Sequence, residues 1–313
     1  MTTTSSPLAI GIDFGGTSVK FGICDGARIV HDAAPIDTTS YYDRGPDALI
    51  AAITDRVGEL RNSHPSITCV GAGVPGLVDF ERGHVFEITN VPGWINIPFR
   101  DELAARTGLP TTVDNDANCM AYAEWRHGAG QGYQNLVAIT LGTGVGGGLI
   151  INGQLHRGAQ FCAGEIGHTS IDHARAGASG GMPGIIEKFV GNRQIAEHAT
   201  ALYAAAGIEK SPDDCTPKAL AESGDQIAAE VWQDVAHWLA IAIANSIWLL
   251  NPEAIVIGGG VARAGDILFD PLEERLKQVL SPVLAENLKL IHAEFGHEAG
   301  TVGAAAQAIA ASP

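Results

Sequence analysis

The sequence contains two copies of one short pattern, in which an apolar strand ends in a glycine-rich turn and a second apolar strand follows at once. The first copy is Ile10–Phe21, with Gly15–Thr17 at its tip, and the second is Ala138–Ile150, with Gly142–Gly144 at its tip. Two copies of one supersecondary unit indicate a duplicated fold with two related lobes. We therefore expect an α/β protein in which each lobe contains one of these hairpins.

The composition limits the classes of partner. The chain has 313 residues, of which 46% are hydrophobic, and this is enough for a large core divided between two lobes. Its formal net charge is −16. A chain this acidic is not expected to bind nucleic acid or an anionic membrane, because both require a positive field on the protein. The phosphates of a bound nucleotide would have to be held by backbone N–H groups, helix ends and a metal ion.

Cysteine usage and the N-terminus indicate a cytoplasmic protein. The cysteines are odd in number, widely spaced and without a CxxC pair, which is typical of free thiols in a reducing compartment: Cys24, Cys69, Cys119, Cys162 and Cys215. The N-terminal sequence lacks the basic and apolar regions of a signal peptide. The longest apolar stretch, near Val235–Leu250, is interrupted by polar residues and is too short to span a bilayer.

Apolar runs that end at Gly, Pro or Asn predict strands, and a period near 3.6 residues predicts helices. The expected strands cover residues 8–14, 19–24, 68–74, 111–113, 136–141, 148–151 and 254–257. The expected helices cover residues 47–62, 97–107, 119–125, 183–198, 227–250, 270–280 and 300–311. Gly207–Asp225 is polar and rich in turn residues, so we expect it to form a surface excursion.

The first glycine-rich turn has the composition of a phosphate-binding loop. Gly15 and Gly16 have no Cβ, so the backbone N–H groups at the hairpin tip can approach phosphate oxygens, and the Thr17 hydroxyl adds a donor. Asp13 stands close enough to hold Mg²⁺ through a water molecule. The alternative is a tight turn that binds nothing.

The second turn, Gly142–Gly147, matches the GxGxxG pattern of dinucleotide-binding proteins. A Rossmann site requires a helix directly after the turn. Here the chain runs on as a strand into a hairpin turn at Asn152–Gly153. A second phosphate hairpin, at Gly142, Thr143 and Gly144, therefore fits better than an NAD site.

A third glycine cluster, Gly258, Gly259 and Gly260, follows the strand expected over residues 254–257. A bare glycine surface suits a flat purine or a phosphate. A sheet-to-helix corner without a ligand is the alternative.

Three groups of polar residues are candidates for acid–base chemistry and for binding a sugar. Asp114, Asn115 and Asp116 lie at a strand end just before a helix, where one carboxylate can accept the proton of an attacking hydroxyl. Polar residues also cluster at such positions as turn formers and helix caps. Glu165 and His168 can hydrogen-bond a sugar diol, although such a pair is usually a surface or capping arrangement. Glu187, near a predicted helix start, is by itself an ordinary exposed acid.

Taken together and in order, these motifs resemble the ROK family (repressors, open reading frames and sugar kinases) of the actin-like ATPase superfamily. The resemblance runs from about Ile10 to Ala306. It implies a duplicated ribonuclease-H-like fold of two lobes with a cleft between them. It assigns Asp116 as the catalytic base. It assigns phosphate binding to two motifs: Asp13, Gly15, Gly16, Thr17 and Lys20; and Gly142, Thr143 and Gly144. It assigns the adenosine side to Gly258, Gly259 and Gly260, and sugar binding to Gly76, Asn115, Glu165, His168 and Glu187.

The chain departs from the family at a zinc site. Relatives usually carry a CxCGxxGC segment just before the acidic residue that Glu187 matches. This segment binds zinc together with the histidine that His168 matches. The corresponding positions here are Ala178, Gly180 and Ile185, and none of these side chains can ligate a metal. His168 with nearby His173 is too few ligands, so we predict that no zinc is bound.

The resemblance implies ATP-dependent phosphorylation of the 6-hydroxyl of a hexose, with Mg²⁺ as the metal. The segment Asn90–Trp94 is more similar to the glucokinase branch than to the N-acetylhexosamine branch, so glucose is the expected substrate. Alternatives are a kinase for N-acetylglucosamine or N-acetylmannosamine, or one for fructose or mannose. A non-catalytic sugar sensor is an alternative of another class, and the presence of Asp116 argues against it.

The expected lobes are a small N-terminal one, residues 1–117 with 298–313, and a large C-terminal one, residues 118–297. The family's repressors carry a helix-turn-helix module ahead of the first phosphate motif, and the segment before Asp13 leaves no room for one. The expected partners are therefore the sugar and ATP, without nucleic acid or membrane. Family resemblance also implies a homodimer.

Overall fold

The computed structural model describes residues 7–88, 90–174 and 182–312. The chain divides into two compact units. Unit 1 comprises Met1–Gln131, Leu155–Ala163 and His297–Pro313, and unit 2 comprises Gly132–Gln154 and Gly164–Gly296. Unit 1 therefore extends beyond the expected boundary at residue 117, and it takes a short segment from the middle of the chain.

Unit 1 is built on a five-stranded sheet in the order β3-β2-β1-β4-β8. A three-stranded sheet, β5-β6-β7, is formed by the chain between β4 and β8. Its strands are β1 (Leu8–Phe14), β2 (Ser18–Cys24), β3 (Ile29–Asp37), β4 (Ile67–Val74), β5 (Leu77–Asp79), β6 (His84–Glu87), β7 (Ile95–Ile97) and β8 (Thr111–Asn115). Its helices are α1 (Gly45–Ser63), α2 (Phe99–Thr107), α3 (Asp116–His127) and α10 (Ala299–Ala311).

Unit 2 is built on a second five-stranded sheet in the order β11-β10-β9-β12-β13, and the passage of the chain to unit 1 falls within β11. Its strands are β9 (Leu136–Leu141), β10 (Val145–Ile151), β11 (Gln154–His156), β12 (Ala254–Gly258) and β13 (Lys289–His292). Its helices are α4 (Glu187–Val190), α5 (Asn192–Ala205), α6 (Pro217–Ser223), α7 (Gln226–Leu250), α8 (Asp266–Val279) and α9 (Pro282–Asn287).

The two sheets share one topology. In unit 1 the hairpin β1–β2 is antiparallel, and β4 and then β8 add parallel to β1. In unit 2 the hairpin β9–β10 is antiparallel, and β12 and then β13 add parallel to β9. The prediction of a duplicated α/β fold from the repeated hairpin is confirmed.

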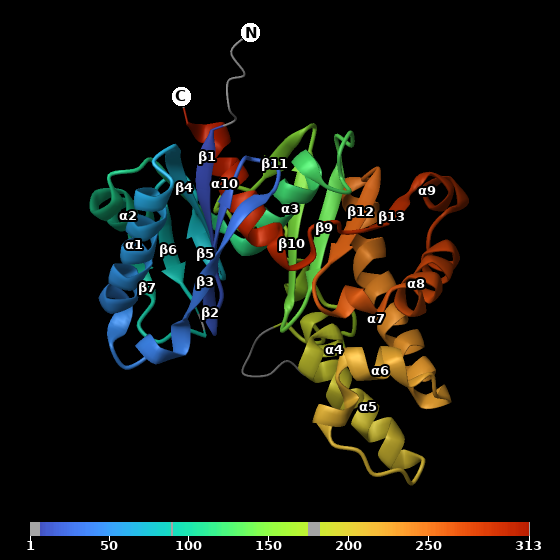
Figure 1. Ribbon diagram of the computed structural model, residues 1–313. Coiled ribbons are helices and arrows are strands. Elements are labelled where there is room, and N and C mark those ends of the chain that lie inside the picture. The colour runs from blue at the N-terminus through green and yellow to red at the C-terminus, as the bar shows by residue number, and fades with distance from the viewer. Residues whose placement is uncertain (1–6, 89, 175–181, 313) are drawn as a thin grey trace. The chain divides into compact units, whose positions relative to one another are not determined.

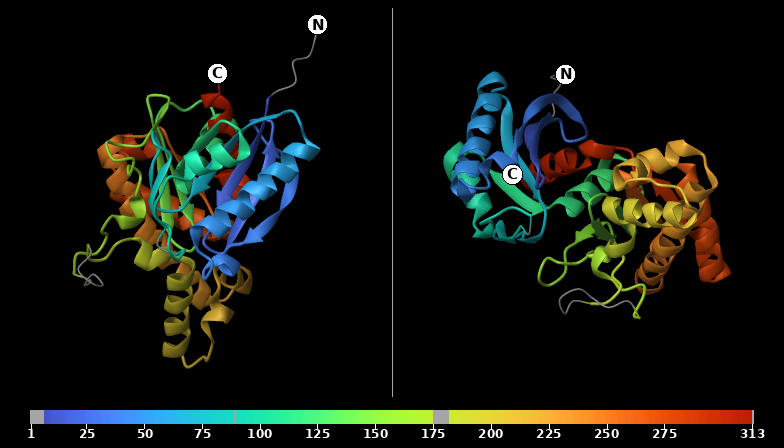
Figure 2. Two further views of the ribbon diagram at one scale, coloured as in Figure 1. Left: turned by 90° about the vertical axis from the view of Figure 1, so that its left-hand side faces the viewer. Right: turned by 90° about the horizontal axis from the view of Figure 1, so that it is seen from below.

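Strand β1 shows how its sequence positions helices on both faces of the sheet. Ile10, Ile12 and Phe14 belong to a buried cluster with the apolar side of α1. The alternate residues are small, and Gly11 lies so close to α10 that a Cβ there would stand 2.0 Å from the backbone oxygen of Thr301. Because side chains alternate across a strand, the large residues face one helix and the small residues admit the backbone of the other. Figures 1 and 2 show α1 in blue and α10 in red on opposite faces of this sheet.

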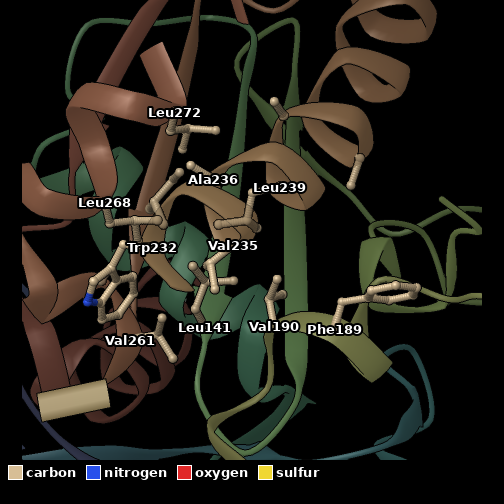
Figure 3. Packing of buried hydrophobic residues seen from close by; sticks show 14 of the residues in the cluster. Leu141, Phe189, Val190, Trp232, Val235, Ala236, Leu239, Val261, Leu268 and Leu272 are labelled. Carbon is tan, nitrogen blue, oxygen red and sulfur yellow. The ribbon is translucent and has the colours of Figure 1, made fainter. Parts of the chain in front are cut away.

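In unit 2 the core lies against α7, the longest helix of the described chain. Its buried residues Trp232, Val235 and Leu239 pack with Leu141 at the end of β9 and with Leu268 of α8. Figure 3 shows these side chains directed toward one another. The base of the second glycine-rich turn is thus fixed in a hydrophobic core, which holds the turn itself in a defined conformation.

Some expected elements differ from the structure. The helix expected over residues 183–198 is interrupted at Gly191, an extended residue between α4 and α5. The expected surface excursion Gly207–Asp225 is wrong in part, because it contains α6 and buries Cys215 and Leu220 in the core of unit 2. Within residues 7–88, 90–174 and 182–312, no helix is long and apolar enough to cross a membrane.

Candidate active site

The first glycine-rich turn presents backbone donors while its acceptors are occupied. The carbonyl oxygens of Gly15, Gly16 and Thr17 accept hydrogen bonds from the Thr38 hydroxyl (3.0 Å), the Tyr42 hydroxyl (2.8 Å) and the Thr38 N–H (3.0 Å), respectively. Gly15 N–H closes the hairpin on Ser18 O at 2.9 Å. In the part of the chain that the structure describes, the N–H groups of Gly16 and Thr17 have no partner. Two adjacent free donors with their carbonyls tied back form a concave anion-binding surface.

Asp13 and Lys20 lie opposite each other on β1 and β2, just below this turn. Lys20 Nζ donates to Asp13 Oδ2 at 3.0 Å, and the two side chains are 45% and 21% exposed. The Asp13 carboxyl rests against Gly300, in the first turn of α10, where a Cβ would approach it to 3.0 Å. It therefore faces the N-terminal, positive end of that helix. Asp13 is therefore held by a lysine and a helix end, with one carboxylate oxygen outside the Lys20 contact.

The second glycine-rich turn is built in the same way. Gly142 N–H donates to Gly144 O at 2.9 Å, and Gly142 O accepts the N–H of Asn192, the first residue of α5, at 2.8 Å. The N–H groups of Thr143 and Gly144 have no partner among the described residues. Each unit thus carries a hairpin with two adjacent free N–H donors at its tip.

Glu187 contacts the second turn directly. Its Oε2 accepts the N–H of Val145 at 3.1 Å. A Cβ built on Gly144 would lie 2.3 Å from the same oxygen, so the carboxylate occupies the space that any larger residue at Gly144 would need. The sequence alone gave no sign of this contact, because the two residues are far apart along the chain and neither motif refers to the other.

The third glycine cluster divides into two roles. Gly259 has φ +90°, and a Cβ there would stand 2.2 Å from the backbone oxygen of Leu141, so glycine is required for packing. Gly258 ends β12 beside Thr140. A Cβ on Gly260 would meet nothing within 4 Å, which leaves that face open. The corner is therefore structural at Gly259, and it offers a bare surface at Gly260.

Asn115 is the N-cap of α3. Its Oδ1 accepts the N–H groups of Ala117 (2.9 Å) and Asn118 (3.1 Å), and its Nδ2 donates to Gly76 O at 3.1 Å. Gly76 has φ +94°, and a Cβ there would collide with the backbone oxygen of Glu87 at 2.2 Å. The carboxamide therefore fixes both the helix start and the Gly76 loop, and one Nδ2 hydrogen remains for a ligand.

Asp116 is the first residue of α3, and its Oδ1 accepts the N–H of Ala117 at 2.9 Å. Its Cα lies over Gly73 of β4, where a Cβ would stand 3.5 Å from it and 3.1 Å from Cys119 Sγ. Burial is the main cause that raises the pKa of the Cys119 thiol, with the Asp114 and Asp116 charges adding to it. The thiol next to Asp116 is therefore neutral and adds no charge at the head of α3.

Glu165 and His168 lie on one short turn of unit 2. Glu165 Oε2 and His168 Nε2 are 3.9 Å apart, and the side chains are 36% and 66% exposed. Burial raises the pKa of Glu165, the His168 charge lowers it, and the Glu187 charge raises it further. The Glu165 carboxyl therefore lies beside one imidazole and one carboxylate, where its oxygens can accept hydrogen bonds from hydroxyl groups.

The residues that precede Glu187 do not fit a zinc site. Ile185 is an aliphatic residue in an isolated β-bridge with Ser170, whose hydroxyl donates to Pro183 O at 2.6 Å. Ala178 and Gly180 lie outside the described residues. Across residues 7–88, 90–174 and 182–312 there is no group of three or more His, Cys, Asp or Glu side chains placed to hold a metal ion. The prediction that no zinc is bound stays a prediction.

The candidate residues divide between the units. Unit 1 carries Asp13, the Gly15–Thr17 turn, Lys20, Gly76, Asn115 and Asp116. Unit 2 carries the Gly142–Gly144 turn, Glu165, His168, Glu187 and the Gly258–Gly260 corner. Each unit thus pairs one phosphate-type turn with polar side chains suited to hydroxyl groups.

Comparisons with known proteins agree on one family. The model described as the ROK family matches residues 9–311. A glucokinase from Halalkalibacterium halodurans is 36% identical over 312 residues, which cover 94% of this chain and 92% of that protein. The structure of a ROK family glucokinase from Streptomyces griseus in complex with glucose and AMPPNP has a TM-score of 0.81 and 31% identity, and covers 96% of this chain and 99% of that one. A ROK family transcriptional regulator, a homolog of the E. coli MLC protein, has a TM-score of 0.84 and 26% identity, over 96% of this chain and 78% of its own.

Proposed function

Because the chain belongs to the ROK family, we propose that it transfers the γ-phosphoryl group of ATP to the 6-hydroxyl of a hexose, namely glucose. The observation that carries the proposal is the pair of hairpins with free N–H donors, together with a carboxylate at the head of α3. The proposed substrate and donor are further supported by the similarity to glucokinases, one of which was solved with glucose and AMPPNP.

The two hairpins are proposed to bind the phosphates of ATP. Their four free N–H groups, at Gly16, Thr17, Thr143 and Gly144, supply donors to phosphate oxygens in a chain whose net charge of −16 provides no broad basic surface. Lys20 adds one positive charge on the unit 1 side. The open glycine face at Gly260 is proposed to lie under the adenosine moiety.

Asp13 is proposed to hold Mg²⁺ through water. This residue fits the ion, because Mg²⁺ in nucleotide sites keeps several waters and takes one or two carboxylates together with the phosphates. The Lys20 and α10 contacts keep the Asp13 carboxylate in place. When bound, the ion would neutralise charge that develops on the phosphate oxygens.

The sugar is proposed to be held by Asn115, Glu165, His168 and Glu187, with Gly76 packed near it. Asp116 then accepts the proton of the 6-hydroxyl as that oxygen attacks the γ-phosphorus in line, and ADP leaves. Asn115 and Asp116 follow each other at the start of a capped helix, so the same turn holds the sugar and points the base. Positioning and charge neutralisation supply most of the acceleration in such a reaction.

The alternative of another class is a sugar-binding regulator. The similarity to a ROK family regulator means that this fold by itself does not separate the two functions. A regulator has no need of a base at the attacking hydroxyl. Asp116, fixed over Gly73 at the helix start, therefore favours the kinase.

A coupled assay of ADP release tests the proposal. Mg²⁺-ATP is supplied with glucose, N-acetylglucosamine, N-acetylmannosamine, mannose or fructose, and EDTA-treated and zinc-supplemented enzyme are compared. We expect turnover with glucose that is unchanged by zinc. Turnover with an acetamido sugar alone would keep the kinase and overturn the substrate, whereas no turnover with any of these sugars would favour the regulator. A rise in turnover on adding zinc would show that the prediction of no zinc site is wrong.

The contact between Glu187 and Gly144 predicts that one glycine controls sugar binding. Gly144→Ala places a methyl group where the Glu187 carboxylate lies, 2.3 Å from Oε2, and must displace it. We expect the Kd for glucose, measured by calorimetry without nucleotide, to rise about tenfold, as for the loss of a hydrogen bond to a charged group. Gly142→Ala is the matched control, because its Cβ would meet nothing within 4 Å. Equal effects of the two changes would contradict a sugar-binding role for Glu187.

We also propose that the protein works in the cytoplasm as a homodimer. The location is supported by the cysteines, because none of the five forms a disulfide in the described chain and four of them are buried. The dimer is supported by family resemblance. Light scattering that gave a mass near the 32.5 kDa of one chain would overturn the dimer.

A further inference from the structure

Asp114 directly precedes Asn115, the proposed sugar ligand, and Asp116, the proposed base. It is a buried carboxylate, and both of its oxygens accept hydrogen bonds. Its side chain is 4% exposed. Oδ1 accepts the backbone N–H of Asn115 at 2.8 Å and the Asn118 carboxamide at 3.1 Å. Asn118 N–H in turn donates to Asn115 Oδ1. The direction in which the Asn115–Asp116 turn leaves β8 is therefore tied to the position of the Asp114 carboxylate.

Arg157 holds the other oxygen of Asp114. Its Nε and Nη2 donate to Asp114 Oδ2 at 3.0 and 2.8 Å, and Nη2 also lies 2.9 Å from Gln307 Oε1 of α10. The guanidinium stacks on Phe80, with Cζ 3.5 Å from the ring centroid. The two N–H contacts to Asp114 Oδ2 and the stacking on the Phe80 ring fix the plane of the guanidinium. A lysine ammonium group cannot reproduce this geometry.

The place of Arg157 in the chain makes the contact unusual. It lies in Leu155–Ala163, a nine-residue segment of unit 1 whose chain neighbours on both sides belong to unit 2. Glu165, a proposed sugar ligand, follows two residues after this segment ends. A buried ion pair is weak evidence for stability, because desolvation offsets much of the attraction. Its position suggests that it serves geometry.

We propose that Arg157 is a positioning residue for phosphoryl transfer: through Asp114 it sets the direction of the Asn115 amide and the Asp116 carboxylate. Without the guanidinium, Asp114 is a buried charge with no counter-ion and must recruit water or turn away. Its Oδ1 then leaves the Asn115 N–H, and the base loses its alignment with the hydroxyl. Small misplacements of this kind lower turnover strongly while the substrates still bind. The role rests on the proposed function.

The test compares wild type, Arg157→Ala, Arg157→Lys and the control Arg100→Ala in the glucose assay. Arg100 is a half-buried arginine of α2 in the same unit that pairs with Asp101 and donates to Glu81 O, and it has no hydrogen bond to Asp114 or Asn115 among the described residues. We expect kcat to fall about 100-fold in Arg157→Ala, with both KM values within threefold of wild type and the Arg100 variant unchanged. Lys should recover little of the loss. Millimolar guanidinium, but not sodium, should restore turnover to Arg157→Ala, because it can refill the site between Asp114 and Phe80.

A second variant separates positioning from stability. In Arg157→Ala/Asp114→Asn the uncompensated charge is gone, so thermal stability should return toward wild type while kcat stays low. Recovery of kcat together with stability, or a kcat in Arg157→Ala within threefold of wild type, would overturn the role. So would equal rescue by sodium chloride. Absence of turnover in the wild type would instead overturn the proposed function, and this role with it.

Discussion

Asp116→Asn is expected to lower kcat for glucose by about 10²–10⁴-fold, the range for loss of a general base. Asn has the shape of Asp and keeps an oxygen for the Ala117 N–H, which Asp116 Oδ1 accepts at 2.9 Å, so the start of α3 should be preserved. What is lost is the capacity to take the proton of the attacking hydroxyl. Initial rates in the coupled assay give kcat, and calorimetry gives Kd for glucose and for ATP.

Both Kd values should stay within a few-fold of wild type, because the change is proposed to act on turnover rather than on ground-state binding. Asp101→Asn, an exposed carboxylate on α2 of the same unit, is the matched control and should leave kcat unchanged. A kcat within a few-fold of wild type in Asp116→Asn would mean that the base lies elsewhere. Loss of glucose binding with kcat retained would make Asp116 a sugar ligand instead.

Gly303→Ala is expected to destabilise unit 1 by about 3 kcal/mol, the upper range for forcing a methyl group into packed atoms. Gly303 lies within α10 and faces α3, where a Cβ would stand 1.7 Å from the backbone oxygen of Cys119. Backbone cannot step aside as a side chain can, so the two helices must separate. By the usual scaling the melting temperature should fall by roughly 6–12 °C, measured by calorimetry.

Gly58→Ala provides the control of opposite sign. Gly58 lies inside α1 of the same unit, and a Cβ there would meet nothing within 4 Å. Removing a glycine from a helix interior should stabilise the protein by about 0.5–1 kcal/mol. If both changes stabilised the protein, α10 and α3 would not be in backbone contact. If both destabilised it, glycine would be needed in α1 for another reason.

Much of the fold was predictable because the informative signals are local. The strand–turn–strand pattern at Gly15 and at Gly142 spans only a dozen residues, and both hairpins form as expected. Strand β3 and the sheet β5-β6-β7 were missed, because β3 is largely exposed and the other strands have three or four residues, too few for a period to show. The helix expected over 183–198 ignored the break at Gly191.

The residues of the candidate site could be named from the sequence, but the contacts that hold them in place could not. Motifs named Glu187 and Gly144 separately, and only folding reveals that one fills the space beside the other. Asp114 was named as an acid–base candidate or turn residue, whereas its partner Arg157 stands 43 positions later and carries no motif. The carbonyls of the first turn are likewise held by Thr38 and Tyr42, and Gly142 O of the second turn by the Asn192 N–H, all of them distant in sequence. Contacts between distant positions are set by packing, which local patterns do not encode.

The position of α10 has a consequence for folding during synthesis. This helix supplies the backbone that fills the shallow face over Gly11 and Gly71, and it is synthesised after all of unit 2. While a ribosome adds residues 132–296, the first sheet must wait with that face uncovered. Gly11 and Thr301 are far apart in the sequence, with all of unit 2 between them, so their contact forms slowly and leaves apolar surface open to wrong partners. The first sheet is thus translated before unit 2 but completed only after it, and the yield of the protein in cells should depend on what covers the nascent sheet in the meantime.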